Sequence, residues 1–308
     1  MIERTPILNI VTHLILFTGL VLLMVPLYLT FVAATLSMEQ VSQIPPRLLP
    51  GDQLLVNIAS AWEKSDFGHK FVNSFILAFG VVTGKIVLAA MTAFGIVFFN
   101  HRLRMPIFWL VFITLMLPLE VRIVPTYAVA ANALTPFQAI LDVTGLSAVI
   151  NWLTGIEVAL EWNLLNSYAG LIIPLVATAT GTFLYRQFFL TIPDELVEAA
   201  QMDGAGPVRF LVEHLVPLSR TNIAALATIM FVYSWNQYLW PLLVITDPNY
   251  GVVAVELGHL VPNSNSTGGG DPQWHLAMAG TLIVMVPPVA VVIFMQRWFV
   301  RGLINTDK

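Results

Sequence analysis

Long apolar stretches alternate with short polar ones along the 308-residue chain, and this pattern predicts membrane-spanning helices. A helix needs about 20 mostly apolar residues to cross the hydrocarbon core of a bilayer. Helices are the expected spanning elements because they satisfy their own backbone hydrogen bonds in lipid. Six stretches are long enough: residues 12–35, 73–99, 106–131, 168–189, 222–246 and 274–298. The prediction is therefore an all-α integral membrane protein with six transmembrane helices.

The composition agrees with a membrane protein. Hydrophobic residues make up 57% of the chain and charged residues only 10%, whereas soluble domains carry about 25% charged residues. The absence of cysteine excludes disulfides, zinc sites with Cys ligands and iron–sulfur clusters. The chain has no run of basic residues of the kind that binds nucleic acid. Its six histidines do not have the spacing of metal ligands. We therefore expect no metal site.

The distribution of Lys and Arg predicts the orientation, because cytoplasmic loops carry an excess of both. With six crossings, the two termini and the segment 191–220 share the side that collects Arg4, Arg102, Arg104, Arg186, Arg209, Arg220, Arg297, Arg301 and Lys308. The N- and C-termini are therefore both predicted to be cytoplasmic. Residues 132–162 resemble a seventh span, but a crossing there would break this charge bias. Since they also carry Asp142 and Glu157, we predict external helices at the membrane interface, within a single transmembrane domain 1–308.

The cytoplasmic segment 191–220 reads "TIPDELVEAAQMDGAGPVRFLVEHLVPLSR". Its first half has the signals of a short, well-capped helix. Thr191 and Asp194 have the spacing of a capping box, and Pro193 suits a first helical turn. Gly204 follows "ELVEAAQM" and is a favourable residue for a left-handed cap at the C-terminus.

The second half of this segment predicts another short helix, which restarts at Gly206-Pro207 and stops at Pro217. Small and charged residues gather around the bend between the two helices: Glu198, Ala199, Ala200, Asp203 and Gly204. Small side chains allow another surface to approach closely, so the pattern indicates a docking element for a cytoplasmic partner. The alternative is a solvated loop, which needs neither a cap nor this density of small residues.

The stretch "EAAQMDGA", with Pro217 placed 13 residues beyond Gly204, resembles the EAA signature of permeases from binding-protein-dependent ABC importers. In that family this loop is the coupling helix, which sits in a groove of a cytoplasmic ATPase. "ITLMLPLEVRIVPTY" and "WNQYLWPLLVITD" are similar to the carbohydrate-uptake group that includes the maltose permeases, and above all to its E-type permeases for sn-glycerol-3-phosphate. The resemblance covers most of the chain except 132–162, which looks like an insertion.

The resemblance implies a transport subunit of the bacterial inner membrane rather than an enzyme. Its implied partners are a second permease, a homodimeric ABC ATPase that binds ATP and Mg²⁺, an external substrate-binding protein and membrane lipid. This chain is expected to bind no cofactor itself, because "GVVTGKI" around Lys85 departs from the spacing of a phosphate-binding P-loop. The resemblance also implies that the Gly-rich external loop 261–274 probes the binding protein, although by composition it is simply a flexible linker.

The implied cargo is sn-glycerol-3-phosphate or a glycerophosphodiester. A neutral sugar or polyol carried by the same machinery is the first alternative. An ion-coupled secondary transporter is a different class, against which the docking element argues. A membrane scaffold without transport is a third class; it predicts that neutralising the charged residues of the spans leaves uptake intact.

Charged residues at membrane depth are candidates for the transport path, because an unpaired charge in lipid is costly. Lys85 lies well inside the second span, and Glu120 and Arg122 lie in "LPLEVRIVP" toward the external end of the third. The prolines of that motif are expected to interrupt the helix, as in discontinuous transporter helices. Arg122 suits an anionic substrate, since guanidinium matches phosphate in geometry. The alternative is an ion pair between helices that holds subunits together.

Polar and aromatic residues within the fifth span form a second candidate set: Trp235, Asn236 and Gln237, in "YSWNQYLWPLL". The amides can hydrogen-bond hydroxyl groups, while an aromatic ring stacks on the apolar face of a polyol or sugar. The alternative is hydrogen bonding between helices together with an aromatic belt at the membrane interface. Related sugar permeases share the Trp-Asn pair, so the pair alone does not identify a substrate.

Overall fold

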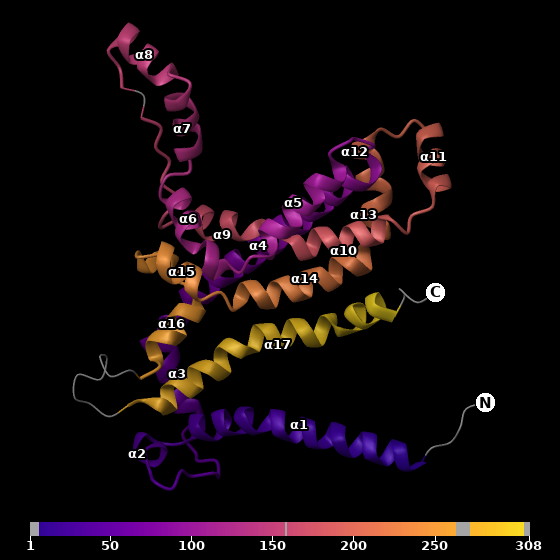
Figure 1. The fold of residues 1–308 in the computed structure, drawn as a ribbon. Coiled ribbons are helices and arrows are strands. Elements are labelled where there is room, and N and C mark those ends of the chain that lie inside the picture. The colour runs from indigo at the N-terminus through magenta and orange to yellow at the C-terminus, as the bar shows by residue number, and fades with distance from the viewer. Residues whose placement is uncertain (1–5, 158, 263–271, 305–308) are drawn as a thin grey trace. The chain divides into compact units, whose positions relative to one another are not determined.

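The computed structural model describes residues 6–157, 159–262 and 272–304, and every regular element within these ranges is helical (Figure 1). The longer helices are α1 (Pro6–Thr35), α4 (Phe67–Phe98), α5 (Arg104–Met116), α6 (Leu119–Ala131), α9 (Tyr168–Val176), α10 (Ala179–Phe189), α14 (Arg220–Trp235) and α17 (Trp274–Ile304). Shorter elements complete the chain: α2 (Met38–Val41), α3 (Leu54–Lys64), α7 (Thr135–Val143), α8 (Leu146–Thr154), α11 (Asp194–Met202), α12 (Pro207–Phe210), the π-helix η1 (Leu211–Leu215), α13 (Val216–Leu218), α15 (Leu239–Val244), the 3₁₀-helix η2 (Pro248–Tyr250) and α16 (Val253–Leu260). The prediction of an all-α protein is confirmed.

Three helices are long and apolar enough to cross a membrane unaided: Ile7–Thr35, Phe67–Phe98 and Trp274–Gln296. Three bent pairs also qualify if each pair counts as one span: α5 with α6, bent by 100°, α9 with α10, bent by 48°, and Pro207–Leu218 with α14, bent by 77°. This gives up to six spans by length and composition. The count of six and the cytoplasmic placement of both termini stay predictions.

The apolar pattern predicted continuous helices where the structure contains breaks. The stretch 106–131 is interrupted at Leu117 and Pro118, which accords with the interruption expected from its prolines. Leu117 is extended because a residue that precedes proline is disfavoured in the helical region. The stretch 168–189 is interrupted at Ala177 and Thr178, both extended. The stretch 222–246 is interrupted between α14 and α15. Two of these breaks contain polar residues, Thr178 in one and Asn236 with Gln237 in another, and the remaining one contains Pro118. An average of hydropathy over 20 residues conceals them.

Contacts divide the chain into two compact units, and the prediction of a single domain stays a prediction. One unit comprises Met1–Gly68 and Glu256–Pro287. Its core is lined by small side chains, with Ala34, Ala61 and Ala279 fully buried. Asn57 is also buried and donates hydrogen bonds to the carbonyls of Ala34 (2.9 Å) and Leu36 (2.8 Å). This amide thereby fastens α3 to the end of α1.

The other unit comprises His69–Val255 and Pro288–Lys308, and it contains the candidate functional residues. Its core packs Leu77 and Val81 of α4 against Leu171 and Leu175 of α9 and against Trp240 of α15. The indole N–H of Trp240 donates a hydrogen bond of 3.1 Å to the carbonyl of Gly170. This bond satisfies the polar end of a fully buried ring.

Two glycines of α4 allow α9 to approach closely. A Cβ added at Gly80 would lie 2.6 Å from Ile172 Cδ1, and a Cβ added at Gly84 would lie 2.7 Å from both γ-carbons of Val176. Gly80 and Gly84 are four residues apart, as are Ile172 and Val176, so two side chains of one helix pack over two glycines of the other. This is the small-xxx-small packing common between membrane helices. The stretch "GVVTGKI" is thus a packing motif rather than a phosphate loop.

Replacing Gly84 with leucine is expected to destabilise this unit by about 1–3 kcal/mol, because the new side chain occupies the space of Val176. Thermal unfolding of the detergent-solubilised complex measures the effect as a lower Tm. Gly95→Leu on the same helix is the matched control, because a Cβ at Gly95 meets no atom within 4 Å. An equal fall in Tm for the two variants would contradict the packing role of Gly84.

Residues 132–162 contain two short helices, α7 and α8, and both ends of the segment meet at Asn132. The Asn132 amide donates to the carbonyl of Leu160 (3.0 Å) and accepts from the backbone N–H of Trp162 (3.1 Å). The helices expose large apolar side chains, among them Val143 and Trp152. Exposed apolar helices suit the predicted position at the membrane interface, which stays a prediction.

Candidate functional site

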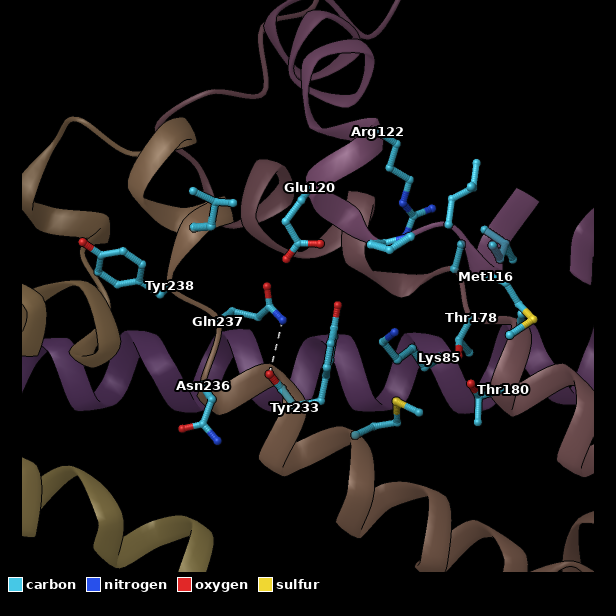
Figure 2. A pocket seen from close by; sticks show the side chains of 17 residues that line it. Lys85, Met116, Glu120, Arg122, Thr178, Thr180, Tyr233, Asn236, Gln237 and Tyr238 are labelled. Carbon is cyan, nitrogen blue, oxygen red and sulfur yellow. Dashed lines mark hydrogen bonds between the residues drawn. The ribbon is translucent and has the colours of Figure 1, made fainter. Parts of the chain in front are cut away.

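Three helix breaks and the middle of α4 enclose a cavity of about 520 Å³ (Figure 2). The breaks lie between α5 and α6, between α9 and α10, and between α14 and α15. Five of the six path candidates chosen from the sequence line this one cavity: Lys85, Glu120, Arg122, Asn236 and Gln237. The structure therefore brings together residues that are up to 152 positions apart.

Two cationic side chains line the cavity without an acidic partner. Lys85 is only 6% exposed, and its Nζ atom lies 4.9 Å from the ring centroid of Tyr233. Within the described parts of the chain, no carboxylate oxygen lies within 4.0 Å of Lys85 or Arg122. The Nε atom of Arg122 is buried and has no hydrogen-bond partner there. The ion pair considered as an alternative role is therefore not formed within the described chain.

The acid and the amides lie toward the opposite end of the cavity from the α10 residues Thr178 and Thr180 in Figure 2. Glu120 is exposed to the cavity. Asn236 donates to the carbonyl of Val232 (2.9 Å) and Gln237 to the carbonyl of Tyr233 (3.4 Å). Both amides thus cap carbonyls of the last turn of α14, whereas the structural alternative expected hydrogen bonds between different helices. Their side-chain oxygens have no donor within the described residues and are available to a ligand.

The sequence reasoning missed the start of α10. Thr178 is the N-cap of this helix, and its hydroxyl accepts a hydrogen bond from the N–H of Gly181 (3.3 Å). Thr178 and the next residues, Ala179 and Thr180, line the cavity. A Thr-Ala-Thr-Gly sequence in the middle of an apolar stretch is the signal that predicts a cap there.

Trp235 does not line the cavity, contrary to the first of the two interpretations drawn from the sequence, in which its ring stacks on a substrate. It is 1% exposed and packs against three phenylalanines. Its ring centroid lies 4.9 Å from that of Phe75, 5.5 Å from that of Phe71 and 5.8 Å from that of Phe231. Trp235 therefore belongs to an aromatic core between α4 and α14. Tyr233 and Tyr238 are the aromatic residues of this stretch that line the cavity.

The predicted coupling segment forms a bent set of short helices (Figure 1). The first, α11, ends as predicted, because Gly204 adopts a left-handed φ of +75°. Gly204 N–H donates to Gln201 (3.0 Å) and Ala205 N–H donates to Ala200 (2.9 Å), which together form a Schellman motif. A Cβ at Gly204 would meet no atom, so backbone conformation alone favours glycine there.

The predicted capping box is not formed at the start of α11. Pro193 is the N-cap and makes no side-chain cap bond, so it precedes the first turn rather than lying within it. The hydroxyl of Thr191 instead bonds the carbonyl of Phe188 (2.7 Å) at the end of α10. Asp194 still suits the N-terminus of α11, because a carboxylate there is favourable to the helix dipole.

Pro217 does not stop the second helix of the segment, contrary to prediction. The chain is π-helical from Leu211 to Leu215 and α-helical again from Val216 to Leu218. The wider π-turn relieves the clash of a proline ring with the preceding turn, and proline needs no partner for its missing N–H. The bend falls two residues later, at Ser219, before α14 begins.

The side chains around the bend differ in their access to a partner. Glu198, Asp203 and Gly204 are exposed, and Ala199 is half-buried. Ala200 is 3% exposed and packs inside the segment, so it supports the bend rather than contacting a partner. Met202 is 83% exposed and Val208 74%, although both are apolar. The segment therefore presents an apolar and acidic surface.

In the second half of the segment, Arg209 donates a hydrogen bond of 2.8 Å to Glu213, and this contact raises the pKa of Arg209.

Comparison with known proteins places the chain in a transporter family. Residues 84–305 match the family described as the inner membrane component of binding-protein-dependent transport systems. The chain belongs to this family. It is thus an inner-membrane permease subunit of an ABC importer, as the EAA signature implied. The match includes the cavity residues and the coupling segment.

This permease is also similar to curated proteins over its full length. The sn-glycerol-3-phosphate transport system permease protein of Salmonella typhi is 46% identical over 314 residues, with both chains covered completely. The protein of the same name from Yersinia pestis bv. Antiqua (strain Antiqua) is 44% identical, also over both full lengths.

Two solved structures share the fold of this permease. A chain of a bacterial ABC transporter involved in the import of the acidic polysaccharide alginate superposes with a TM-score of 0.72 at 19% identity, covering 97% of this chain and 99% of that chain. A bacterial alginate ABC transporter in complex with an alginate pentasaccharide-bound periplasmic protein gives a TM-score of 0.59 at 15% identity, with 93% of both chains covered. At these identities the likeness establishes the fold alone.

Proposed function

We propose that this permease subunit moves sn-glycerol-3-phosphate, or a related glycerophosphodiester, across the inner membrane. The observation that carries the proposal is the full-length identity of 44–46% to permeases named for sn-glycerol-3-phosphate transport. The cavity supports the same cargo on independent grounds. The charged side chains that line it are two cations, Lys85 and Arg122, and one acid, Glu120, so their net charge is one positive charge. A cavity of that sign at membrane depth suits an anionic cargo.

The proposed complex contains a second permease, two copies of an ABC ATPase and an external substrate-binding protein. ATP and Mg²⁺ are bound by the ATPase, and the exposed surface at Glu198, Met202 and Asp203 docks in a groove of that subunit. Closure of the ATPase dimer on ATP moves this segment as a rigid body, because the Schellman motif and the continuous η1–α13 helix connect it to α14. The movement opens the path outward, and hydrolysis returns it. The predicted role of the external loop 261–274 falls largely outside the described residues.

The test of the cargo is ATP hydrolysis by the reconstituted four-part complex with its binding protein. We expect sn-glycerol-3-phosphate or glycerophosphocholine to stimulate hydrolysis several-fold, and maltose or glycerol to leave it at the basal rate. Stimulation by the neutral compounds alone would keep the importer and reject the phosphate cargo. No stimulation by any compound, with an active ATPase present, would reject the coupling role of the segment 191–220.

A neutral sugar or polyol is the second candidate cargo, because the free amide oxygens of Asn236 and Gln237 can accept hydrogen bonds from hydroxyl groups. It accounts less well for Lys85 and Arg122, since a neutral cargo leaves both cations of the cavity unpaired. The same panel of compounds decides between the two cargoes.

A further inference from the structure

We infer that the amino end of α10, together with Lys85, forms a phosphate subsite inside the cavity. The inference rests on the proposed function and specifies which part of the cargo is held where. The phosphate group lies against the first turn of α10, and the hydroxyl-bearing carbons extend toward Glu120, Asn236 and Gln237. The start of α10 is the part of the cavity wall that the sequence did not indicate.

The first turn of α10 presents free donors to the cavity. The cap Thr178 accepts only from Gly181, which leaves the N–H groups of Ala179 and Thr180 with no acceptor within the described residues. Both residues line the cavity. Free N–H groups and the positive end of the helix dipole make such a terminus a site for anions. Because α10 has 11 residues, its dipole is developed well beyond a single turn.

Lys85 is the second, independent observation that points to an anion. Lys85 is only 6% exposed, and it lines the same cavity. Its ammonium has no hydrogen-bond acceptor and no carboxylate within 4.0 Å in the described chain, only the face of Tyr233. A buried ammonium in this state is costly unless a ligand supplies the negative charge. Figure 2 shows Lys85 between the threonines of α10 and the amides of the opposite end.

Close helix packing holds the two parts of the subsite together. Val176 packs against Gly84, which precedes Lys85 in α4. Val176 is also the last residue of α9, so it lies just before the break at which α10 starts. Gly181 has a similar role, because a Cβ there would lie 2.9 Å from Ala89 Cβ of α4. Small residues on either side thus bring the terminus of α10 against α4 at the depth of Lys85. Discontinuous helices place their amino ends at anionic substrate groups in this way in other transporters.

The subsite predicts a polarised cargo. A phosphate monoester carries about −1.5 to −2 charges at neutral pH, which suits the free donors, Lys85 and the nearby guanidinium of Arg122. The acid Glu120 repels phosphate from the opposite end and accepts hydrogen bonds from hydroxyl groups there. A glycerol carrying one terminal phosphate has this division of charge, whereas a uniformly neutral polyol does not.

Thr180→Asp tests the subsite, because it places a carboxylate where the phosphate would lie. An acid in the first turn favours the helix, so α10 is expected to stay folded. We expect uptake of labelled sn-glycerol-3-phosphate into proteoliposomes, per ATP hydrolysed at saturating loaded binding protein, to fall about tenfold or more. Thr180→Asn has the size without the charge and should keep at least about a third of the uptake. Gln187→Glu adds an acid at an exposed position at the other end of α10 and should transport at the wild-type rate.

Lys85→Met is the second variant, and it removes the ammonium while keeping an apolar side chain of similar length. It should lower uptake per ATP by a similar factor, whereas Lys85→Arg restores part of it. Equal uptake by Thr180→Asp and Gln187→Glu, with the wild-type complex active on sn-glycerol-3-phosphate, would overturn the subsite and leave the proposed function standing. A wild-type complex that transports no phosphate compound but transports a neutral sugar would overturn both.

Discussion

Replacing Gly204 with valine is expected to uncouple ATP hydrolysis from transport in the assembled importer. Gly204 has a φ of +75°, and a left-handed conformation costs a residue with a side chain about 1–2 kcal/mol, most of all a β-branched one. The Schellman bonds that end α11 would then be lost, and with them the fixed angle between α11 and α12. Stimulation of hydrolysis by loaded binding protein should fall about five- to thirtyfold, since each 1.4 kcal/mol is a factor of ten.

The controls separate backbone conformation from crowding. Gly206 lies two residues away, also has no atom within 4 Å of an added Cβ, and has an ordinary φ of −72°. Gly206→Ala should therefore hydrolyse ATP and transport cargo as the wild type does. Gly204→Asn should keep most of the coupling, because asparagine tolerates the left-handed region. Equal losses in Gly204→Val and Gly204→Asn would argue that side-chain size at the docking surface matters, and not the turn.

Replacing Arg122 with methionine is expected to lower uptake of a phosphate-bearing cargo by about tenfold or more. A hydrogen bond to a charged group contributes about 1.5–3 kcal/mol, and Arg122 offers several such donors to the cavity. Its Nε atom already lacks a partner within the described residues, so no internal bond of the chain is lost with it. Uptake of labelled sn-glycerol-3-phosphate into proteoliposomes, normalised to the amount of assembled complex, measures the effect.

Glu120→Gln, in the same cavity, is expected to change uptake in the opposite direction to Arg122→Met. Removing the acid lowers the repulsion of an anionic cargo, so uptake is expected to rise or to saturate at lower cargo concentration. If Arg122 and Glu120 instead hold subunits together as ion-pair residues, both substitutions should lower the yield of intact complex on size-exclusion chromatography. A loss of complex in both variants, with normal uptake by what remains, would contradict the transport role of Arg122.

The candidate site was partly predictable from single residues. Lys85, Glu120 and Arg122 are charged residues in apolar stretches, and each draws attention without knowledge of the fold because a charge in lipid is costly. Asn236 and Gln237 line the cavity as well, although their donors cap α14, and their contact with a substrate stays a prediction. Trp235 was misplaced, because one residue of helix rotation decides whether a ring faces a cavity or Phe75.

The coupling segment illustrates which local signals can be relied on. Gly204 was correctly predicted as a left-handed cap, because glycine tolerates this conformation better than any other residue. Thr191 was wrongly assigned to a capping box, because its hydroxyl has a closer acceptor in the preceding helix, the carbonyl of Phe188. Pro217 was expected to end a helix, but a π-turn before it provides the necessary space.

The sequence by itself determined that this protein is all-helical, and its EAA signature identified the family of inner-membrane permeases to which it belongs. The helical class follows from the length of the apolar stretches, and the left-handed cap at Gly204 from glycine's backbone freedom, both of which are local properties. Only the tertiary structure decided where the helices break, that Val176 packs over Gly84, and that the start of α10 meets Lys85 in one cavity. Such features depend on contacts between residues far apart in the chain, and neither hydropathy nor spacing encodes those contacts.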